Sequence, residues 1–291
     1  MTDTLEQCAQ QLDNSEDYQV LRRLQPRTKF HSATDETKLH RVCVIDTETT
    51  GLDNQSCEIL ELGYQIIEFD SQGNFYQVVA SKNFLNEPEN EIPAEVTDVT
   101  GIRFEDVEGH HIPWDEVEQD MIDVQLCVAH NASFDRPVVE RYHPIFAQKI
   151  WGCSVQQIDW LALTKVSSRS QEVLCWQIAK LFYGAHRAID DVYALSELLS
   201  QPIGPNQESA FHYLLKAVRV SKTLIKATGA PFDLKDALKS RDYRWNASEK
   251  VWQKTFEDSQ LDAEQEWLGR QGVSPTLRKL KATDTFSIRA N

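Results

Sequence analysis

The stretch VCVIDTETTGL, residues 42–52, decides the fold class of this chain. Its first four residues form a continuous apolar run, which is typical of a strand buried on both faces of a sheet. Asp46 and Glu48 follow two residues apart, so in an extended strand their carboxylates point to one face and can converge on one cation. An acid pair at a strand end is usually only solvated, so this pair needs support from elsewhere in the chain.

The segments around this strand predict a mixed sheet. Apolar and polar residues alternate over 60–66, which predicts a half-buried strand, and a turn at 70–73 leads into another strand over 75–80. From about residue 93 the pattern is helical. It continues with a strand at 126–130, a helix from about Ser133, an edge strand within 150–160 and helices over 171–183 and 188–200. An antiparallel meander followed by alternating helices and strands predicts an α/β fold with helices flanking the sheet.

Asp135 belongs to a second acidic segment, HNASFD at 130–135. It falls in the first turn of the predicted helix, which Asn131 or Ser133 would cap, and the helix dipole favours a carboxylate there. Considered alone, this segment is explained better by capping than by metal binding.

The third segment, HRAIDD at 186–191, discriminates better between the two explanations. On the helix that begins near residue 188, Asp191 shares a face with Leu195 and Leu198, so its carboxylate leans toward the core. An inward carboxylate is costly to ionise unless a metal or another partner compensates it. His186 lies just before this helix, where its ring can reach the same pocket. The three acidic segments together predict a site for two divalent cations.

Charge is distributed unevenly along the 291 residues. Residues 1–210 hold 15 Lys+Arg against 35 Asp+Glu, a net charge of −20, while residues 211–291 hold 15 against 10, a net charge of +5. An acidic metal-binding body joined to a basic segment indicates that the second part attracts phosphate. The alternative is a solvated basic tail.

These patterns predict three parts: a helical extension at 1–39, a catalytic domain at 40–205 and a small basic module at 211–291. In the extension, Tyr18, Leu21 and Leu24 would form a narrow apolar seam. The absence of a long apolar run and the polar start predict no membrane span, no secretory signal and a cytoplasmic protein. The six cysteines lack metal-binding spacing, which predicts free, buried thiols.

DxETTGL at 46–52, HNxxFD at 130–135 and HRAxxD at 186–191 resemble the three exonuclease motifs of the DEDDh (DnaQ-like) family. This group includes the proofreading subunit of the bacterial replicative polymerase and ribonuclease T. The resemblance covers about residues 40–200, and 95–102 is similar to a segment between the first two motifs. It implies a ribonuclease-H-like fold and the removal of nucleotides from a 3′ end.

The resemblance also implies a role for each site residue. Asp46 would bridge two metals, Glu48 and Asp191 would bind the metal on the nucleophile side, Asp135 would bind the other, and His186 would be the general base. Carboxylate oxygens without cysteine favour Mg²⁺ or Mn²⁺ over zinc. The other candidate substrate contacts lie in the first two motifs: Thr49, Thr50, Gly51 and Leu52, the last a wedge against the terminal base, with Asn131 and Phe134.

Residues 230–252 resemble a small module appended to some bacterial members of this family. Basic residues interleave there with Tyr243, Trp245 and Trp252, a composition suited to tracking a backbone while the tryptophans stack on bases. The alternative is that the tryptophans form the core of a small β-hairpin, and both can hold.

The sequence therefore predicts a metal-dependent 3′→5′ exonuclease that acts on single-stranded or frayed nucleic acid, with DNA modestly favoured over RNA, and releases nucleoside 5′-monophosphates. One alternative is an exoribonuclease that trims RNA 3′ ends, because nothing in the motifs reads the 2′-OH. Another alternative is a non-catalytic nucleic-acid-binding or replisome-docking subunit. The loss of one of the four motif acids would have favoured it, and all four are present. The motifs identify no polymerase or other protein partner.

Overall fold

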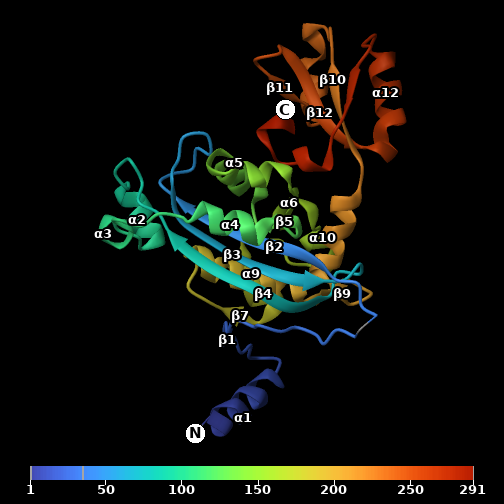
Figure 1. Cartoon of the computed structure of the whole chain (residues 1–291). Coiled ribbons are helices and arrows are strands. Elements are labelled where there is room, and N and C mark those ends of the chain that lie inside the picture. The colour runs from blue at the N-terminus through green and yellow to red at the C-terminus, as the bar shows by residue number, and fades with distance from the viewer. Residues whose placement is uncertain (1, 35, 291) are drawn as a thin grey trace. The chain divides into compact units, whose positions relative to one another are not determined.

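The chain divides into two compact units, Met1–Leu215 and Lys216–Asn291. The computed structural model, drawn in Figure 1, describes residues 2–34 and 36–290. The boundary lies within helix α10 (Ala210–Arg219) and not before residue 211. The reason is that Phe211 packs against Phe69 and Phe75, with ring centroids 5.1 and 4.6 Å apart, so the first half of α10 belongs to the larger unit.

The larger unit is built on a five-stranded sheet of order β4-β3-β2-β5-β6. The first three strands run antiparallel to one another, whereas β5 and β6 run parallel to β2. This arrangement confirms the predicted mixed sheet that opens as a meander. The strands are β2 (His40–Thr49), β3 (Ile59–Phe69), β4 (Phe75–Leu85), β5 (Val124–Ala129) and β6 (Ile150–Cys153).

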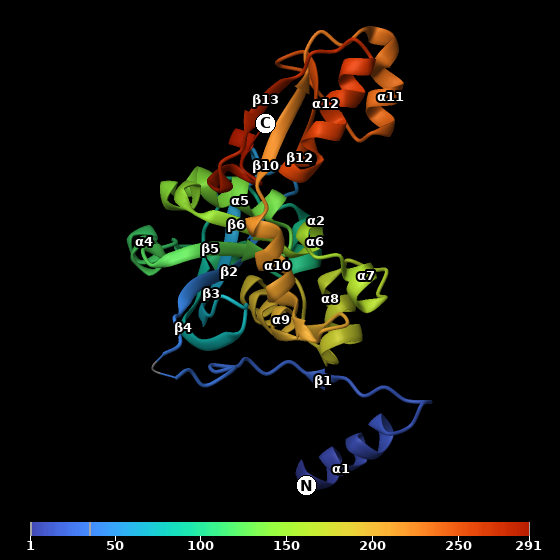
Figure 2. The ribbon, with the colours of Figure 1, turned by 90° about the vertical axis from the view of Figure 1, so that its right-hand side faces the viewer.

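Helices cover both faces of this sheet. Figures 1 and 2 show α9 on one face and α4 and α5 on the other. The helix predicted over 171–183 is shorter than expected, because a π-helical turn over Cys175–Ala179 ends it at Lys180, whose backbone is left-handed. The helices are α2 (Ala94–Thr100), α3 (Phe104–Val107), α4 (Trp114–Met121), α5 (Ala132–Tyr142), α6 (Ser154–Gln157), α7 (Trp160–Thr164), α8 (Gln171–Leu174) and α9 (Ala188–Ser200).

Strand β3 is buried on both faces, so the prediction of a half-buried strand is wrong. On one face Gly63 lets the backbone of α9 approach, since a Cβ there would lie only 2.6 Å from the Ala188 carbonyl carbon. On the other face the Tyr64 hydroxyl donates a hydrogen bond of 2.8 Å to Asp120 of α4. Glu61 and Gln65 of β3 are therefore buried polar residues.

The N-terminal extension is helical only over α1 (Thr2–Asp13), and the predicted apolar seam is wrong. Tyr18, Leu21 and Leu24 lie beyond the end of α1, in extended chain. Strand β1 (Arg22–Arg23) pairs in parallel with β7 (Leu181–Phe182), which holds this segment on the larger unit. Backbone pairing thus replaces the helix expected there. A short hairpin of β8 (Pro202–Ile203) and β9 (Glu208–Ser209) precedes α10.

The smaller unit has an antiparallel sheet of order β11-β12-β10-β13 and its own apolar core. The core includes Leu238 of α11, Tyr243, Phe256 of β12 and Leu268 of α12. The elements are β10 (Lys222–Ala227), α11 (Lys235–Ser240), β11 (Arg244–Asn246), β12 (Val251–Glu257), α12 (Leu261–Arg270) and β13 (Thr276–Lys279).

Among residues 2–34 and 36–290, no helix combines the length and the apolar character needed to cross a bilayer. All six cysteines are free thiols, as predicted, and Cys8 is the one that is exposed instead of buried.

Candidate active site

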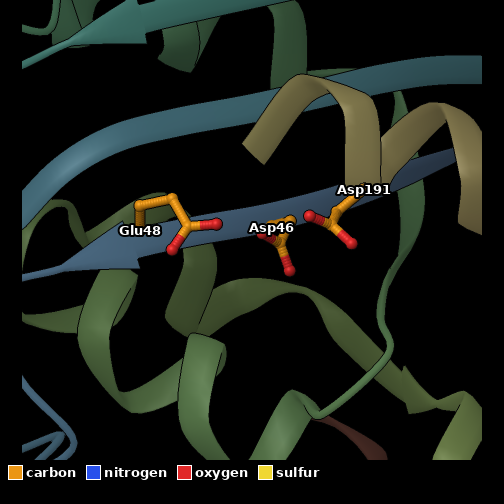
Figure 3. A group of neighbouring side chains, drawn as sticks. All are labelled: Asp46, Glu48 and Asp191. Carbon is orange, nitrogen blue, oxygen red and sulfur yellow. The ribbon is translucent and has the colours of Figure 1, made fainter. Parts of the chain in front are cut away.

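Three carboxylates from two elements converge at the edge of the larger unit's core. Asp46 and Glu48 extend from β2 and Asp191 from α9, as Figure 3 shows, and one oxygen of each lies within 4.8 Å of the others. The register explains the approach, because Asp46 lies directly opposite Gly63 on β3. The missing side chain at Gly63 lets the first turn of α9 settle beside Asp46.

A pocket of about 360 Å³ surrounds these carboxylates. Asp135 and His186 also line it, so the structure brings together all five residues that the three motifs predicted. Asn131 and Phe134 line it as well.

Asp135 is buried and fixed by Thr47 of β2. Its Oδ1 accepts hydrogen bonds from the Thr47 N–H at 3.1 Å and the Thr47 hydroxyl at 2.9 Å. Strand β5 pairs with β2 only as far as Val44, which leaves the Thr47 N–H available to a side chain. Asn131 occupies the N-cap position of α5, yet within the described residues its side chain makes no capping hydrogen bond. Asp135 does lie in the first turn of α5, where the helix dipole favours a carboxylate.

Asp191 is held by three donors from the segment around it. The Tyr183 hydroxyl and the Gln171 amide donate to Oδ1 at 2.9 and 3.1 Å. The His186 N–H donates to Oδ2 at 2.8 Å. His186 adopts a φ of 67°, a left-handed conformation that is strained for a residue with a side chain. The five-residue spacing between His186 and Asp191 therefore corresponds to a direct contact.

The crowded carboxylates resist ionisation. Burial, and then repulsion from Asp135, Asp191 and Glu48, raises the pKa of Asp46 well above its usual value. Burial and the neighbouring acids raise the pKa of Glu48 to about 8, and burial raises that of Asp135 to about 7. A divalent cation among these oxygens would relieve the repulsion. A set of carboxylate oxygens with no sulfur fits a hard cation.

The two histidines of the pocket differ in how their rings are engaged. His130 has both ring nitrogens in contact with hydrogen-bond partners, the Ser154 hydroxyl at 2.6 Å and the Arg169 carbonyl at 2.8 Å. Burial lowers the pKa of His130. Among the described residues the ring nitrogens of His186 have no hydrogen-bond partner, and its side chain is exposed. His186 is therefore the histidine available to a substrate.

The loop after β2 is ordered by its own hydrogen bonds. The Thr49 hydroxyl donates to the Gly51 carbonyl at 2.7 Å, and the Thr50 hydroxyl accepts from the Glu58 N–H at 2.9 Å. Leu52 is 93% exposed, with its side chain free to meet a ligand. Along β2 the pocket lining ends at Glu48, so this loop borders the pocket without forming its wall.

Sequence reasoning missed Glu61, which pins α9 to β3. Its fully buried carboxylate accepts from the Arg187 guanidinium at 3.0 and 2.8 Å, from the Ala188 N–H at 3.0 Å and from the Asn83 amide at 2.8 Å. Although burial opposes ionisation, these hydrogen bonds hold the pKa of Glu61 below its usual value. The available signal in the sequence was Glu61, an acid between two leucines of a predicted strand, together with Arg187 next to His186.

Tyr183 and Gln171 were also missed. Their hydrogen bonds to Asp191 depend on how the chain folds between α8 and α9, and no spacing rule predicts them.

The fold and the site define a class of protein, a nuclease of α/β architecture. A family model described as “Exonuclease” matches residues 43–199, more than half of the chain, and the chain belongs to this family.

Two relatives in sequence are named as a DNA polymerase III and as a subunit of one. The chain is 30% identical to DNA polymerase III PolC-type of Thermotoga maritima over an aligned region of 187 residues. This region covers 62% of this chain and 12% of the relative. It is 27% identical over 176 residues to DNA polymerase III subunit epsilon of Treponema pallidum, covering 57% of this chain and 78% of that protein. The chain thus spans about an eighth of the length of the PolC-type relative.

A solved structure shows the same fold. The crystal structure of E. coli Exonuclease I in complex with a dT13 oligonucleotide matches with a TM-score of 0.50 at 13% identity, covering 84% of this chain and 66% of that one. This likeness confirms the expected ribonuclease-H-like fold.

Proposed function

We propose that this protein is a metal-dependent 3′→5′ exonuclease that releases nucleoside 5′-monophosphates from single-stranded or frayed DNA. The observation that carries the proposal is the convergence of the Asp46, Glu48 and Asp191 carboxylates within 4.8 Å, in a pocket that Asp135 and His186 also line. Membership in the exonuclease family supports it.

The carboxylates divide into two ligand groups around Asp46. Asp46, Glu48 and Asp191 would hold one Mg²⁺ or Mn²⁺, and Asp46 with Asp135 would hold a second. Bound cations in such a site would stabilise the anionic phosphate and make a bound water more acidic. The hydrogen bonds from Thr47 to Asp135, and from Tyr183 and Gln171 to Asp191, fix the orientation of these ligands before substrate arrives.

His186 would accept the proton of the attacking water. A histidine exchanges protons near neutral pH, and the ring of His186 is exposed at the pocket. Because its N–H is bonded to Asp191, the backbone at His186 stays fixed relative to one metal ligand while the ring remains free to reach the water.

The 3′ terminal nucleotide would bind between the pocket wall and the loop after β2. Asn131 and Phe134 lie in the wall. Thr49, Thr50 and Gly51 are held in a compact turn, from which the exposed Leu52 side chain would press against the last base. DNA is favoured because the relatives in sequence are components of DNA polymerase III.

The test is digestion of 5′-labelled single-stranded DNA, duplex DNA and RNA with Mg²⁺, with Mn²⁺ and in EDTA. A ladder that shortens from the 3′ end, only with metal, is expected for single-stranded DNA. Asp46→Asn should abolish it, whereas Asp190→Asn, the adjacent acid outside the cluster, should leave it nearly unchanged. Full activity in EDTA or in Asp46→Asn would refute the proposal. If RNA is digested faster than DNA, the preferred substrate is RNA and not DNA.

A further inference from the structure

Exposed aromatic rings and lysines alternate on the smaller unit. Phe232, just before α11, is 78% exposed, and Trp245 of β11 is 50% exposed. A single exposed ring is ordinary on a protein surface, whereas several exposed rings close together can mark a ligand-binding surface. These two rings are therefore candidates for contact with a ligand.

The rings and lysines form a connected row. Lys235 Nζ lies 4.3 Å from the centroid of the Phe232 ring, and Lys239 Nζ lies 5.9 Å from that of Trp252. Trp252 in turn lies 5.5 Å from Trp245, across the hairpin pair of β11 and β12. Lys235 and Lys239 are four residues apart on α11 and so share one side of the helix. We call these five residues the aromatic–basic strip.

The lysines of the strip differ from several other basic residues of the unit. Lys226, Arg241 and Lys279 are each paired with an acid, namely Glu249, Glu264 and Asp258. Within the described residues, Lys235 and Lys239 form no ion pair. Asp236 of α11 is one residue from Lys235 and three residues before Lys239, so it is a helical neighbour of Lys239, but no ion pair joins it to either lysine within the described residues. The positive charge of these two lysines is available to an anion.

Stability of the unit does not account for the strip. The core is filled by Leu238, Tyr243, Phe256 and their neighbours, and Trp252 packs one side against it. Trp252 is therefore partly a core residue, as the hairpin alternative supposed. Trp245 and Phe232 lie outside this core, and their exposed faces are open to a ligand.

We infer that the aromatic–basic strip binds single-stranded nucleic acid, with bases stacked on Phe232 and Trp245 and phosphates neutralised by Lys235 and Lys239. The inference rests on the proposed function for the identity of the ligand. Alternation of flat rings and cations matches the alternation of bases and phosphates along a single strand. The unit's net charge of +5 against −20 for residues 1–210 makes it the part of the chain that attracts a polyanion.

Binding is measured with the full chain in EDTA, by fluorescence anisotropy of labelled oligo(dT), so that hydrolysis does not interfere. Phe232→Ala with Trp245→Ala should weaken binding by about thirtyfold or more, since each of the two stacked bases contributes at least roughly 1 kcal/mol and about 1.4 kcal/mol corresponds to a factor of ten. Lys235→Gln with Lys239→Gln should weaken binding and lower the slope of log K against log salt by about 1.4. Melting temperatures should stay unchanged, because all four side chains lie outside the core.

Control variants are Leu277→Ala and Lys281→Gln, at or just after β13 on the other edge of the sheet, and neither should alter binding. Unchanged affinity in both strip variants would overturn the inference, as would equally tight binding of polyglutamate, which lacks bases. Hydrolysis of a mononucleotide nitrophenyl ester with Mg²⁺ is measured separately and should be unchanged in the strip variants. Failure of the proposed function would appear as no hydrolysis by the wild type, which leaves the metal-free binding result intact.

Discussion

Glu61→Gln tests whether a single buried carboxylate holds the start of α9 on the sheet. Glu61 lies on β3, and it receives four hydrogen bonds, three of them from Arg187 and Ala188 at the start of α9. The glutamine keeps the shape of the side chain. It replaces one acceptor oxygen with an NH₂ group, which would face donors from α9.

The magnitude follows from the bonds that are lost. One amide oxygen can keep two of the four donors, so two bonds disappear, and a hydrogen bond to a charged group contributes about 1.5–3 kcal/mol. The Arg187 side chain is 45% exposed and can turn toward water, which reduces the loss. We expect a destabilisation of about 2–4 kcal/mol, and hence a fall of roughly 4–16 °C in the melting temperature of the larger unit.

Thermal unfolding by calorimetry and turnover on labelled single-stranded DNA are the two assays. Turnover should fall too, because His186 and Asp191 flank the pinned turn. Glu116→Gln is the matched control: it removes an acid paired with Lys82 at the surface, where both side chains are partly exposed, and should cost less than about 1 kcal/mol. If Glu61→Gln melts within 2 °C of the wild type, the buried carboxylate is not what holds α9, and the reasoning fails.

Three further results are expected. The pKa of Glu48 is raised to about 8, so this carboxyl binds its proton more tightly in the folded than in the unfolded state; in EDTA the melting temperature should fall as the pH rises from about 5 to 8, and Glu48→Gln should flatten that fall. His186→Ala should lower turnover by about 10²–10⁴-fold with little loss of substrate binding, and retention of the acid limb of the pH–rate profile would place the base elsewhere. Tyr183→Phe should raise the Mg²⁺ concentration for half-maximal activity by about 10–100-fold, whereas Tyr193→Phe, which loses only a contact with Ser81, should not.

Local patterns in the sequence were sufficient for the strand of the first motif and for the helix of the third. The apolar run before Asp46 becomes the central strand β2, with Asp46 and Glu48 on one face because side chains alternate along a strand. Helix α9 covers the residues expected of it, and Asp191 lines the pocket as its helical face predicted. These features depend on residues within one or two turns of each other, where periodicity is informative.

The same patterns failed where burial depends on distant elements. The alternation of apolar and polar residues predicted that β3 is half-buried. In the structure α9 covers the polar face of β3, because Gly63 allows a close approach. The tryptophans of the hairpin look equivalent in sequence, yet Trp252 packs on the core of the smaller unit while Trp245 is half exposed. Neither difference is visible in spacing, because it is set by which element lies above each residue.

The sequence by itself determined the class of fold, the residues that meet in the pocket and the uneven charge of the chain, because residue type, order and local period encode them. Only the tertiary structure decided what holds those residues in place. These contacts are the two hydrogen bonds from Thr47 to Asp135, the three donors around Asp191 and the ion pair of Glu61 with Arg187. The last joins positions 126 residues apart. Such contacts depend on sheet register and on helix approach, which arise only when the whole unit packs.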